Sequence, residues 1–390
     1  MRHFAFLDDA DRSRLFRHAP AEFGPDAPRE LLACTLGATL YSPATRPTLA
    51  RDLLRGRARG VVSSVLCLED AISDAEVPAA ERNLIDQLRR VASGPSGAAG
   101  GPPLVFVRVR AVEQIRLVVD GLGDAVRVLS GFVIPKFDDE RGAEYLDAVA
   151  DARAVTGLRM FAMPVLETAV IAHADTRLDA LLGIRRLVDK YRDLVLAVRI
   201  GATDLGAAYG LRRGRDLTVY DVHLLASVIA DVVNVFARQG DYVVTGPVWE
   251  YFTATERLFK PQLRESPFVE HDERRLRARL IAQDLDGLIR EVALDRANGL
   301  TGKTVIHPSH VAAVHALSVV TSEEYDDACD IAGTAAGGGV RASAYGNKMN
   351  ESKPHTAWAL RTLRRADAFG VAREEVSFVD LLAAAVHADG

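Results

Sequence analysis

The sequence predicts an α/β protein built as a (β/α)8 TIM barrel, with an insertion after the seventh strand and a helical C-terminal appendage. Short apolar runs rich in Val, Ile and Leu alternate with helix-like segments, which is typical of parallel strands covered on both faces. The chain has 390 residues, 48% hydrophobic and 26% charged, enough for one large barrel with additions. Polar residues recur where the runs end, which favours a barrel over a doubly wound open sheet.

Eight apolar runs are the predicted strands. They are ATLYSP (38–43), VVSSVLCLED (61–70), PLVFVRVR (103–110), GFVIPKF (131–137), RMFAMPVLE (159–167), LVLAVRIGATDL (194–205), YVVTGPVW (242–249) and GKTVIHP (302–308). Helix-like segments lie between them, for example at 81–92, 143–155 and 222–239. A strand followed by a helix, repeated around eight strands, is the pattern of this barrel.

Two segments interrupt the alternation. Residues 93–103 are rich in Gly, Pro and Ser and predict a flexible surface connection. Residues of about 250–300 form a long charged insertion between the seventh and eighth strands. We expect a barrel domain over residues 1–319 and a helical appendage over residues 320–390 that is a candidate lid.

Composition limits the partners and the compartment. The net charge of −5 gives no sign of a nucleic-acid groove. Three scattered cysteines, Cys34, Cys67 and Cys329, favour a reducing cytoplasm over disulfides or a zinc cluster. Acidic residues interrupt the N-terminal segment where a signal peptide needs an apolar run, and no stretch reaches the roughly 18–20 apolar residues of a membrane span. We expect a soluble cytoplasmic protein that binds neither nucleic acid nor a membrane.

Polar residues follow the predicted strands, where barrel enzymes place catalytic groups. They are Tyr41, Pro43, Glu69, Asp70, Arg108, Arg110, Pro135, Lys136, Glu167, Asp204, Trp249, Glu250 and His307. Glu167 and Asp204 end neighbouring strands, so their carboxylates should meet at one rim of the barrel. Two carboxylates completed by water and substrate oxygens suit Mg²⁺, which prefers an incomplete protein cage. The alternative is that each acid caps a helix.

Two arginines lie on one face of the third strand. Arg108 and Arg110 alternate with apolar residues in VFVRVR. A guanidinium beside a metal at the barrel mouth fits two-pronged capture of a substrate carboxylate, which we assign to Arg108. An ion pair with Glu69 or Asp70 is a compatible alternative. The expected substrate-binding residues are Tyr41, Arg108, Arg110, Pro135 and Lys136.

Two motifs resemble a phosphate-binding loop and a zinc site but do not meet the requirements of either. GLTGKT (299–304) lacks the leading glycine of a P-loop and precedes a strand instead of following one. His307, His310 and His315 have no cysteine or third-strand partner that would support zinc, so helix capping and core packing are the better interpretation.

The ordered motifs resemble those of the citrate lyase β-subunit, malyl-CoA lyase and HpcH/HpaI aldolase superfamily. They are CLEDAIS (67–73), VRVR (107–110), VIPKF (133–137), VLET (165–168), IGATDL (200–205) and GKTVIHPSH (302–310). The resemblance spans roughly residues 38–315. It implies a TIM barrel, Mg²⁺ with Mn²⁺ as the alternative, and reversible carbon–carbon bond cleavage through an enolate.

The resemblance also assigns roles to single residues. It implies Glu167 and Asp204 as metal ligands, Arg108 as the arginine that holds the substrate carboxylate, and Glu69 with Asp70 as supporting acids. Two positions depart from the family pattern, because Arg110 replaces an Asn and His310 replaces a Gln. Both changes argue against an acyl-CoA substrate, and the extra positive charge of Arg110 fits a more anionic or phosphorylated one.

Three further segments are similar to a narrower subgroup, the citrate-lyase-like carbon–carbon bond lyases found with tellurite-resistance and stress-response genes. They are residues 219–236, 245–252 and 346–359. In relatives of this kind the C-terminal segment closes over a neighbouring subunit's site. The resemblance therefore implies a homo-oligomer, with Lys348 and His355 as candidate lid residues; a polar surface loop is the alternative.

The expected function is that of a Mg²⁺-dependent carbon–carbon lyase or aldolase acting on a 2-keto or 3-hydroxy acid, CoA-linked or phosphorylated. The general base stays open between a metal-bound hydroxide steadied by Glu69 and a group such as Lys348 or His355. Two other functions remain: a transferase that adds an enolpyruvate or acyl unit, and a non-catalytic scaffold that binds metal or metabolite in a stress-response complex. The intact carboxylates of Glu167 and Asp204 argue against the scaffold.

Overall fold

Eight parallel strands form a closed barrel in the computed structural model, which describes residues 1–94, 103–252, 285–334 and 338–388. The strands are β2 (Ala38–Pro43), β3 (Ser63–Cys67), β4 (Leu104–Arg108), β5 (Leu129–Ile134), β6 (Phe161–Leu166), β7 (Val198–Ile200), β8 (Val244–Thr245) and β9 (Lys303–Val305). They pair in the order β8-β7-β6-β5-β4-β3-β2-β9, and a parallel bridge from Gly246 to Lys303 joins the two ends of the sheet. The predicted barrel is confirmed, although β5 begins two residues before the predicted run.

The strands are apolar on both faces because each face packs against a different layer. Val65, Phe106, Val133 and Met163 point into the barrel, where they form one core cluster. Their neighbours along the strands, such as Phe132, pack outward against the helices in a second cluster. This alternation explains the near-continuous apolar runs of the sequence.

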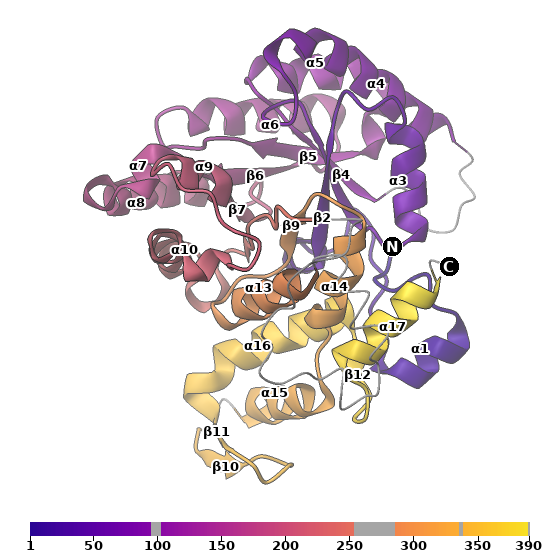
Figure 1. The fold of residues 1–390 in the computed structure, drawn as a ribbon, viewed down its shortest axis with the longest axis vertical. Helices are drawn as coiled ribbons and strands as arrows, with labels where there is room; N and C mark the ends of the chain where they lie inside the picture. Colours follow the sequence, from indigo (N-terminus) through magenta and orange to yellow (C-terminus); the bar gives the residue numbers. More distant parts are fainter. Residues whose placement is uncertain (95–102, 253–284, 335–337, 389–390) are drawn as a thin grey trace.

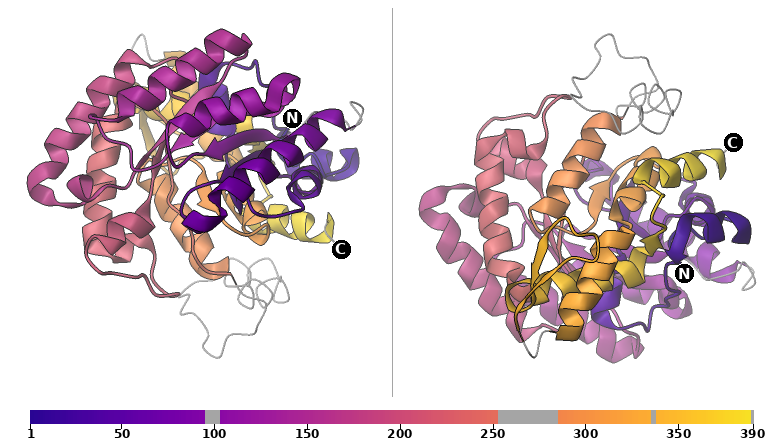
Figure 2. Two further views of the ribbon diagram at one scale, coloured as in Figure 1. Left: turned by 90° about the horizontal axis from the view of Figure 1, so that it is seen from above. Right: turned by 90° about the horizontal axis from the view of Figure 1, so that it is seen from below.

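Helices cover the outside of the barrel (Figures 1 and 2). They are α3 (Leu49–Ala58), α4 (Val77–Ser93), α5 (Glu113–Leu122), α6 (Gly142–Thr156), α7 (Ala169–Ala172), α8 (Ala174–Lys190), α9 (Ala202–Ala207), α10 (His223–Phe236), α13 (Leu285–Ala297) and α14 (Ser309–Ser318), with short 3-10 turns η1 (Asp74–Glu76), η2 (Gly123–Val128), η3 (Val219–Asp221) and η4 (Arg238–Gly240). The three helix-like segments of the sequence thus fall on α4, α6 and α10. The two segments expected to interrupt the alternation lie partly outside the described residues, since residues 95–102 of the first and 253–284 of the second are not described.

A buried ion cluster lies where the barrel closes. The Nζ atom of Lys303 is 2.9 Å from Glu291 Oε1 and 2.7 Å from Asp295 Oδ2. Tyr220 donates to Asp295 Oδ1 at 2.8 Å. The Lys303 ammonium is thereby matched by carboxylates that enter from α13, which ties this helix to the first residue of β9.

Helix α2 (Arg29–Thr35) closes the end of the barrel at which the strands begin. Leu32 and Leu36 are almost fully buried and join the cluster that fills the barrel interior. The barrel interior is therefore apolar at the end where the strands begin.

The C-terminal elements pack beside α2 and α14. They are α15 (Ser322–Thr334), a hairpin of β10 (Val340–Ala342) and β11 (Met349–Glu351), α16 (Ser352–Phe369), β12 (Val371–Ala372) and α17 (Phe378–Ala388). β12 pairs with β1 (Phe16–His18), which follows α1 (Asp9–Leu15), so both ends of the chain lie in this part of the molecule (Figure 1). None of the helices in the described ranges is long and apolar enough to cross a bilayer.

Two histidines are buried where these elements meet the barrel. His315 Nε2 accepts a hydrogen bond from the Ala38 backbone N–H at 3.1 Å, and His3 Nε2 lies 3.0 Å from the Thr35 carbonyl oxygen. Their rings meet edge to face at 4.4 Å, beside Phe369. Burial lowers the pKa of both, to about 3 for His315. Both rings are therefore neutral core residues, as the sequence interpretation of His315 expected.

Candidate active site at the C-terminal ends of the strands

Four carboxylates and two cations meet where the central strands end. Glu69 and Asp70 follow β3, Arg108 ends β4, Lys136 follows β5, Glu167 follows β6, and Asp204 lies in α9 after β7. Parallel strands present their carboxyl ends on one rim, so successive strands supply successive members of the group. The structure thus brings together six of the residues that the sequence singled out.

Arg108 is the centre of the group. Its Nη2 atom is 2.6 Å from Glu69 Oε2, 2.9 Å from Glu167 Oε1 and 3.3 Å from Asp70 Oδ2. Burial favours a neutral side chain, but the charges of Glu167 and Glu69 outweigh it and raise the pKa of Arg108. The guanidinium therefore stays charged and holds three carboxylates at fixed positions.

Lys136 has a backbone conformation that L-residues seldom adopt. Its φ is +45°, a left-handed value that costs about 1–2 kcal/mol for a residue with a Cβ atom. In this conformation its backbone N–H donates to Glu167 Oε1 at 2.9 Å, while its Nζ donates to Glu69 Oε1 at 2.6 Å. The same Nζ lies 3.3 Å from Asp70 Oδ2 and 3.8 Å from Asp204 Oδ1. The strain is thus compensated by contacts with all four carboxylates.

Glu167 is almost fully buried, and its position depends on Gly201. A Cβ atom on Gly201 would lie 2.0 Å from Glu167 Oε2, so only glycine leaves room for the carboxylate. Burial raises the pKa of Glu167 to about 7; Arg108 opposes this shift, and the charge of Asp204 adds to it. A further positive charge close to Glu167 and Asp204 would relieve their repulsion.

The charge balance of the group fits a divalent cation. With all four carboxylates ionised, Arg108 and Lys136 leave an excess of two negative charges. Carboxylate oxygens are the ligands that Mg²⁺ prefers, and it needs few of them because it keeps its waters. Across the described ranges, no three His, Cys, Asp or Glu side chains are arranged as a complete ligand set. The residues therefore fit an open site with Glu167 and Asp204 as the protein ligands and water or substrate supplying the others.

Arg110 does not join this group. Its Nη2 donates to the carbonyl oxygens of Glu69 and Ile72 at 3.1 and 3.2 Å, its Nε donates to that of Leu68 at 3.2 Å, and it pairs with Asp74. The guanidinium thus braces the loop that carries Glu69 and Asp70. The structure places the residue behind the site, where it positions the acids.

Tyr41 lies inside the barrel mouth with an arginine beneath it that the sequence interpretation missed. The Arg199 guanidinium is 5.5 Å from the centre of the Tyr41 ring, and Arg199 donates to Thr304 Oγ1 at 2.6 Å. Arg199 is only 1% exposed and, within the described residues, has no carboxylate partner. A single charged residue within the apolar run 194–200 was the available signal. Pro135 precedes the strained Lys136 and leads it out of β5.

The remaining strand-end and C-terminal candidates have local partners. His307 Nδ1 lies 2.7 Å from Ser309 Oγ and accepts a hydrogen bond from the Ser309 backbone N–H at 3.3 Å, at the first residue of α14. Lys348 Nζ is 2.6 Å from Glu323 and 2.7 Å from Asp327, and His355 Nδ1 accepts from the Glu351 N–H at 3.2 Å. These contacts hold Lys348 and His355 within the C-terminal elements of their own chain.

The comparisons with known proteins agree with this fold. A family described as carbon–carbon bond lyase of the TIM-barrel fold matches residues 30–371. None of the curated protein sequences matches the chain. Among solved structures, the protein CitE of Mycobacterium tuberculosis in complex with magnesium, acetoacetate and coenzyme A is 21% identical, with a TM-score of 0.51 over 85% of this chain and 97% of that one.

Two further solved structures have the same architecture. A citrate lyase from Burkholderia xenovorans is 17% identical, with a TM-score of 0.59 over 89% of this chain and 96% of that one. The malate synthase of Haloferax volcanii, in a complex with magnesium and glyoxylate, is 14% identical, with a TM-score of 0.50 over 71% of this chain and 73% of that one. At these identities the likeness establishes the fold alone.

Proposed function

Because the chain belongs to the carbon–carbon bond lyase family of the TIM-barrel fold, we propose that it makes or breaks a carbon–carbon bond beside a carbonyl group through an enolate. The proposed substrate is a 2-keto or 3-hydroxy acid, CoA-linked or phosphorylated. The observation that carries the proposal is the convergence of Glu69, Asp70, Glu167 and Asp204 on Arg108 and Lys136 at the C-terminal rim.

Glu167 and Asp204 are the proposed ligands of Mg²⁺, with Mn²⁺ as the alternative. When bound, such an ion supplies an electrophile that stabilises the negative oxygen of an enolate. The two carboxylates come from neighbouring strands, and Gly201 leaves room for that of Glu167. The relatives solved with magnesium support this assignment, because the CitE and malate synthase structures both contain it.

Arg108 and Lys136 are the proposed positive groups that meet the substrate. The pKa of Lys136 is raised: burial favours the neutral amine, but the hydrogen bond to Glu69 and the charges of Glu69 and Asp70 outweigh it. Lys136 therefore stays protonated at neutral pH and cannot serve as the general base. Its ammonium and the Arg108 guanidinium orient a substrate carboxylate and favour negative charge on the reacting oxygens.

Glu69 is the proposed group for proton transfer. Burial raises its pKa, and its carboxylate lies against both Arg108 and Lys136. Asp70, its neighbour in the chain, has a lowered pKa because Glu69, Arg108 and Lys136 outweigh the effect of burial. Two adjacent carboxyl groups whose pKa values are shifted apart can divide the roles of proton carrier and permanent anion.

We further propose that the protein works in the cytoplasm as a homo-oligomer, in the setting of the tellurite-resistance and stress-response subgroup that its sequence resembles. The free thiols of Cys34, Cys67 and Cys329 support a reducing compartment. The side chain of Lys348 is 43% exposed, and His355 is partly buried. We include in this proposal that their segment closes over the active site of a neighbouring subunit.

The test is proton NMR of pyruvate and acetyl-CoA in D₂O with the protein and Mg²⁺. Enolate formation exchanges methyl protons for deuterium, so we expect one methyl signal to disappear. A chelator and Glu167→Gln should each prevent the loss, whereas Arg116→Gln, which changes a side chain that is 87% exposed on α5, should not. Exchange that never leads to cleavage of a hydroxy acid would favour the transferase. Cation binding without exchange of either methyl group would favour the scaffold.

A further inference from the structure

A large cavity lies at the end of the barrel opposite the carboxylate rim. Its volume is about 720 Å³, and it is lined by α2, α13, α16 and the loops that precede β8 and β9. Because these loops lead into the strands, the cavity faces the N-terminal ends of the strands, opposite the carboxylate rim. Its size is within the range of about 300–1,000 Å³ that small-molecule sites occupy.

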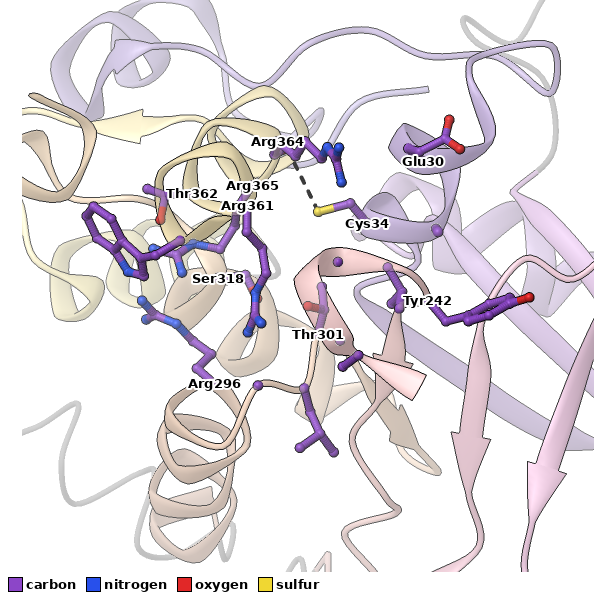
Figure 3. Close-up of a pocket in the computed structure, with 18 of the residues that line it drawn as sticks. Glu30, Cys34, Tyr242, Arg296, Thr301, Ser318, Arg361, Thr362, Arg364 and Arg365 are labelled. Carbon is purple, nitrogen blue, oxygen red and sulfur yellow. Dashed lines mark hydrogen bonds between the residues drawn. The ribbon is translucent and has the colours of Figure 1, made fainter. Parts of the chain in front are cut away.

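Arginines gather on the walls of this cavity. Figure 3 shows Arg296 extending from α13 toward Arg361 and Arg365 of α16, with Arg364 beside Cys34 of α2. A fifth, Arg29, lines the cavity from α2. Three helices distant in the sequence thus direct guanidinium groups at one space.

Few carboxylates balance these arginines. Glu324 pairs with both Arg296 and Arg365, at 3.2 and 2.6 Å. Glu30 pairs with Arg29 at 3.0 Å, and the third acid of the lining, Asp241, pairs with arginines of α8 and its following loop. Within the part of the chain that the structure describes, neither Arg361 nor Arg364 forms an ion pair, although the charge of Arg364 contributes to a lowered pKa of Glu30.

The unpaired arginines lie against glycine loops on the cavity wall. A Cβ atom at Gly299 would be 3.7 Å from both terminal nitrogens of Arg361, and one at Gly240 would be 3.6 Å from Arg364 Nη1. Gly299 and Gly240 have φ values of +91° and +80°, which glycine adopts without strain. The two guanidinium groups therefore lie beside the glycine loops that line the cavity.

Two of these arginines have lowered pKa values. Burial and the charge of Arg365 lower the pKa of Arg296, to about 10, and the same two causes lower the pKa of Arg361. A bound anion would offset the repulsion between these guanidinium groups.

An aromatic residue completes the lining. Trp358, one turn before Arg361 on α16, is 41% exposed, although large apolar side chains are usually buried. An exposed indole beside guanidinium groups offers a stacking surface for a planar base. Arginines suit phosphate oxygens because their paired N–H groups match the geometry of a phosphate.

We propose that this cavity binds an organic polyphosphate of nucleotide size, with Arg296, Arg361 and Arg365 on the phosphates and Trp358 against the base. The ligand is held non-covalently, since burial raises the pKa of the Cys34 thiol to about 11 and leaves it protonated. The site is separate from the carboxylate rim, so its ligand is a second one in addition to the substrate.

Tryptophan fluorescence tests the proposal directly, because the chain has two tryptophans and Trp249 is completely buried. The probes are ADP, adenosine and inorganic pyrophosphate, titrated at low ionic strength against the full chain. We expect ADP to quench the emission, pyrophosphate to compete with ADP, and adenosine to bind much more weakly. In Trp358→Phe the quenching should disappear while calorimetry still detects ADP.

Matched variants identify the residues. Arg361→Gln and Arg296→Gln should each weaken ADP binding on the order of tenfold, because each removes a charge-assisted contact. Arg116→Gln is the control, since Arg116 is 87% exposed on α5, far from the cavity. Circular dichroism melting checks that each variant is folded, and the two independent arginine variants guard against a single folding failure.

Four results would overturn the proposal. The first is that neither ADP nor pyrophosphate binds at millimolar concentration, and the second is that both arginine variants bind ADP as tightly as the control. The third is that Asp204→Asn loses ADP binding. The fourth is that single-stranded RNA binds more tightly than ADP. The third result would assign the nucleotide to the carboxylate rim, and the fourth would make the surface a nucleic-acid site. Asp204→Asn changes only the C-terminal rim. If the proposed lyase function is wrong, the ADP-binding test of the N-terminal cavity is therefore still valid.

Discussion

The two ends of the barrel carry opposite charge surpluses. At the C-terminal rim four carboxylates face two cations, whereas the cavity at the N-terminal end has five arginines and two carboxylates that pair with them. The rim therefore suits a metal cation, and the cavity suits a polyanion. We therefore propose ligands of opposite charge for the two ends of the barrel.

The direction of the helices accounts for part of this difference. Each barrel helix begins near the rim and ends near the opposite face, so helix N-termini favour acids at the rim and helix C-termini favour bases at the other end. Arg296 illustrates this, because it lies in the last turn of α13. The comparison teaches that a strand–helix repeat predisposes its two faces to different ligands.

The largest expected effect is the loss of a metal ligand. Glu167→Gln or Asp204→Asn should lower Mg²⁺-dependent turnover at least ~100-fold, because a bound cation stabilises developing charge by several kcal/mol and ~1.4 kcal/mol corresponds to a factor of ten. Steady-state kinetics on the exchanging substrate measure this change. If both variants keep turnover within a few-fold of wild type, the C-terminal rim does not hold the catalytic cation, and the proposed difference between the two ends of the barrel is wrong.

Next in size is the effect of filling the space beside Glu167. Gly201→Ala introduces a Cβ atom 2.0 Å from Glu167 Oε2 and must displace the carboxylate. We expect ~10–100-fold lower activity, as for groups that orient metal ligands. Gly214→Ala is the control, because nothing lies within 4 Å of its added Cβ atom. Equal activity in the two variants would show that Glu167 does not need its observed position.

Arg108→Lys should have a smaller effect on binding of the substrate. A lysine keeps the charge but cannot contact Glu69, Glu167 and a substrate carboxylate at once. We expect KM to rise about tenfold, with melting temperature unchanged within a few degrees. An unchanged KM would mean that Arg108 does not bind the substrate and only holds the carboxylates in position.

A separate prediction concerns stability, not activity, and involves His315 near the N-terminal end of the barrel. The pKa of His315 is lowered by burial to about 3, from an ordinary value of 6.5. Between these pH values the unfolded chain binds a proton that the folded chain does not, so the free energy of unfolding falls as pH falls from 6.5 toward 3, by about 1.4 kcal/mol per pH unit. Above pH 6.5 the contribution is complete.

Urea unfolding at several pH values measures this slope. His3 and His310 act in the same direction, because burial lowers the pKa of both. His315→Gln should therefore reduce the slope by about one proton and not abolish it. A variant whose slope equals that of wild type would mean that His315 is already protonated in the fold.

The rim could be predicted from sequence because its members are local to the strands. Glu69, Arg108 and Glu167 stand at strand ends, and strand order alone places them together. The strained backbone of Lys136 and the bracing role of Arg110 could not be predicted, since both depend on the exact path of a loop. Arg199 was missed because one charge within an apolar run gives no hint of its partners.

The N-terminal cavity was beyond sequence reasoning for a different reason. Arg296 and Arg361 are separated by more than sixty residues and meet only because α13 and α16 pack near α2. Periodicity gives the face of a helix but not the neighbour against which it packs. The sequence alone therefore gives no sign that Arg296 of α13 and Arg361 of α16 share one cavity.

The most direct test of the opposite charge surpluses is a titration with Mn²⁺ followed by electron paramagnetic resonance. The account predicts that the wild-type protein binds the ion, that Glu167→Gln and Asp204→Asn each abolish the tight binding, and that Arg361→Gln leaves it unchanged. Tight binding retained in both carboxylate variants, or lost in the arginine variant, would contradict the assignment of the cation to the C-terminal rim.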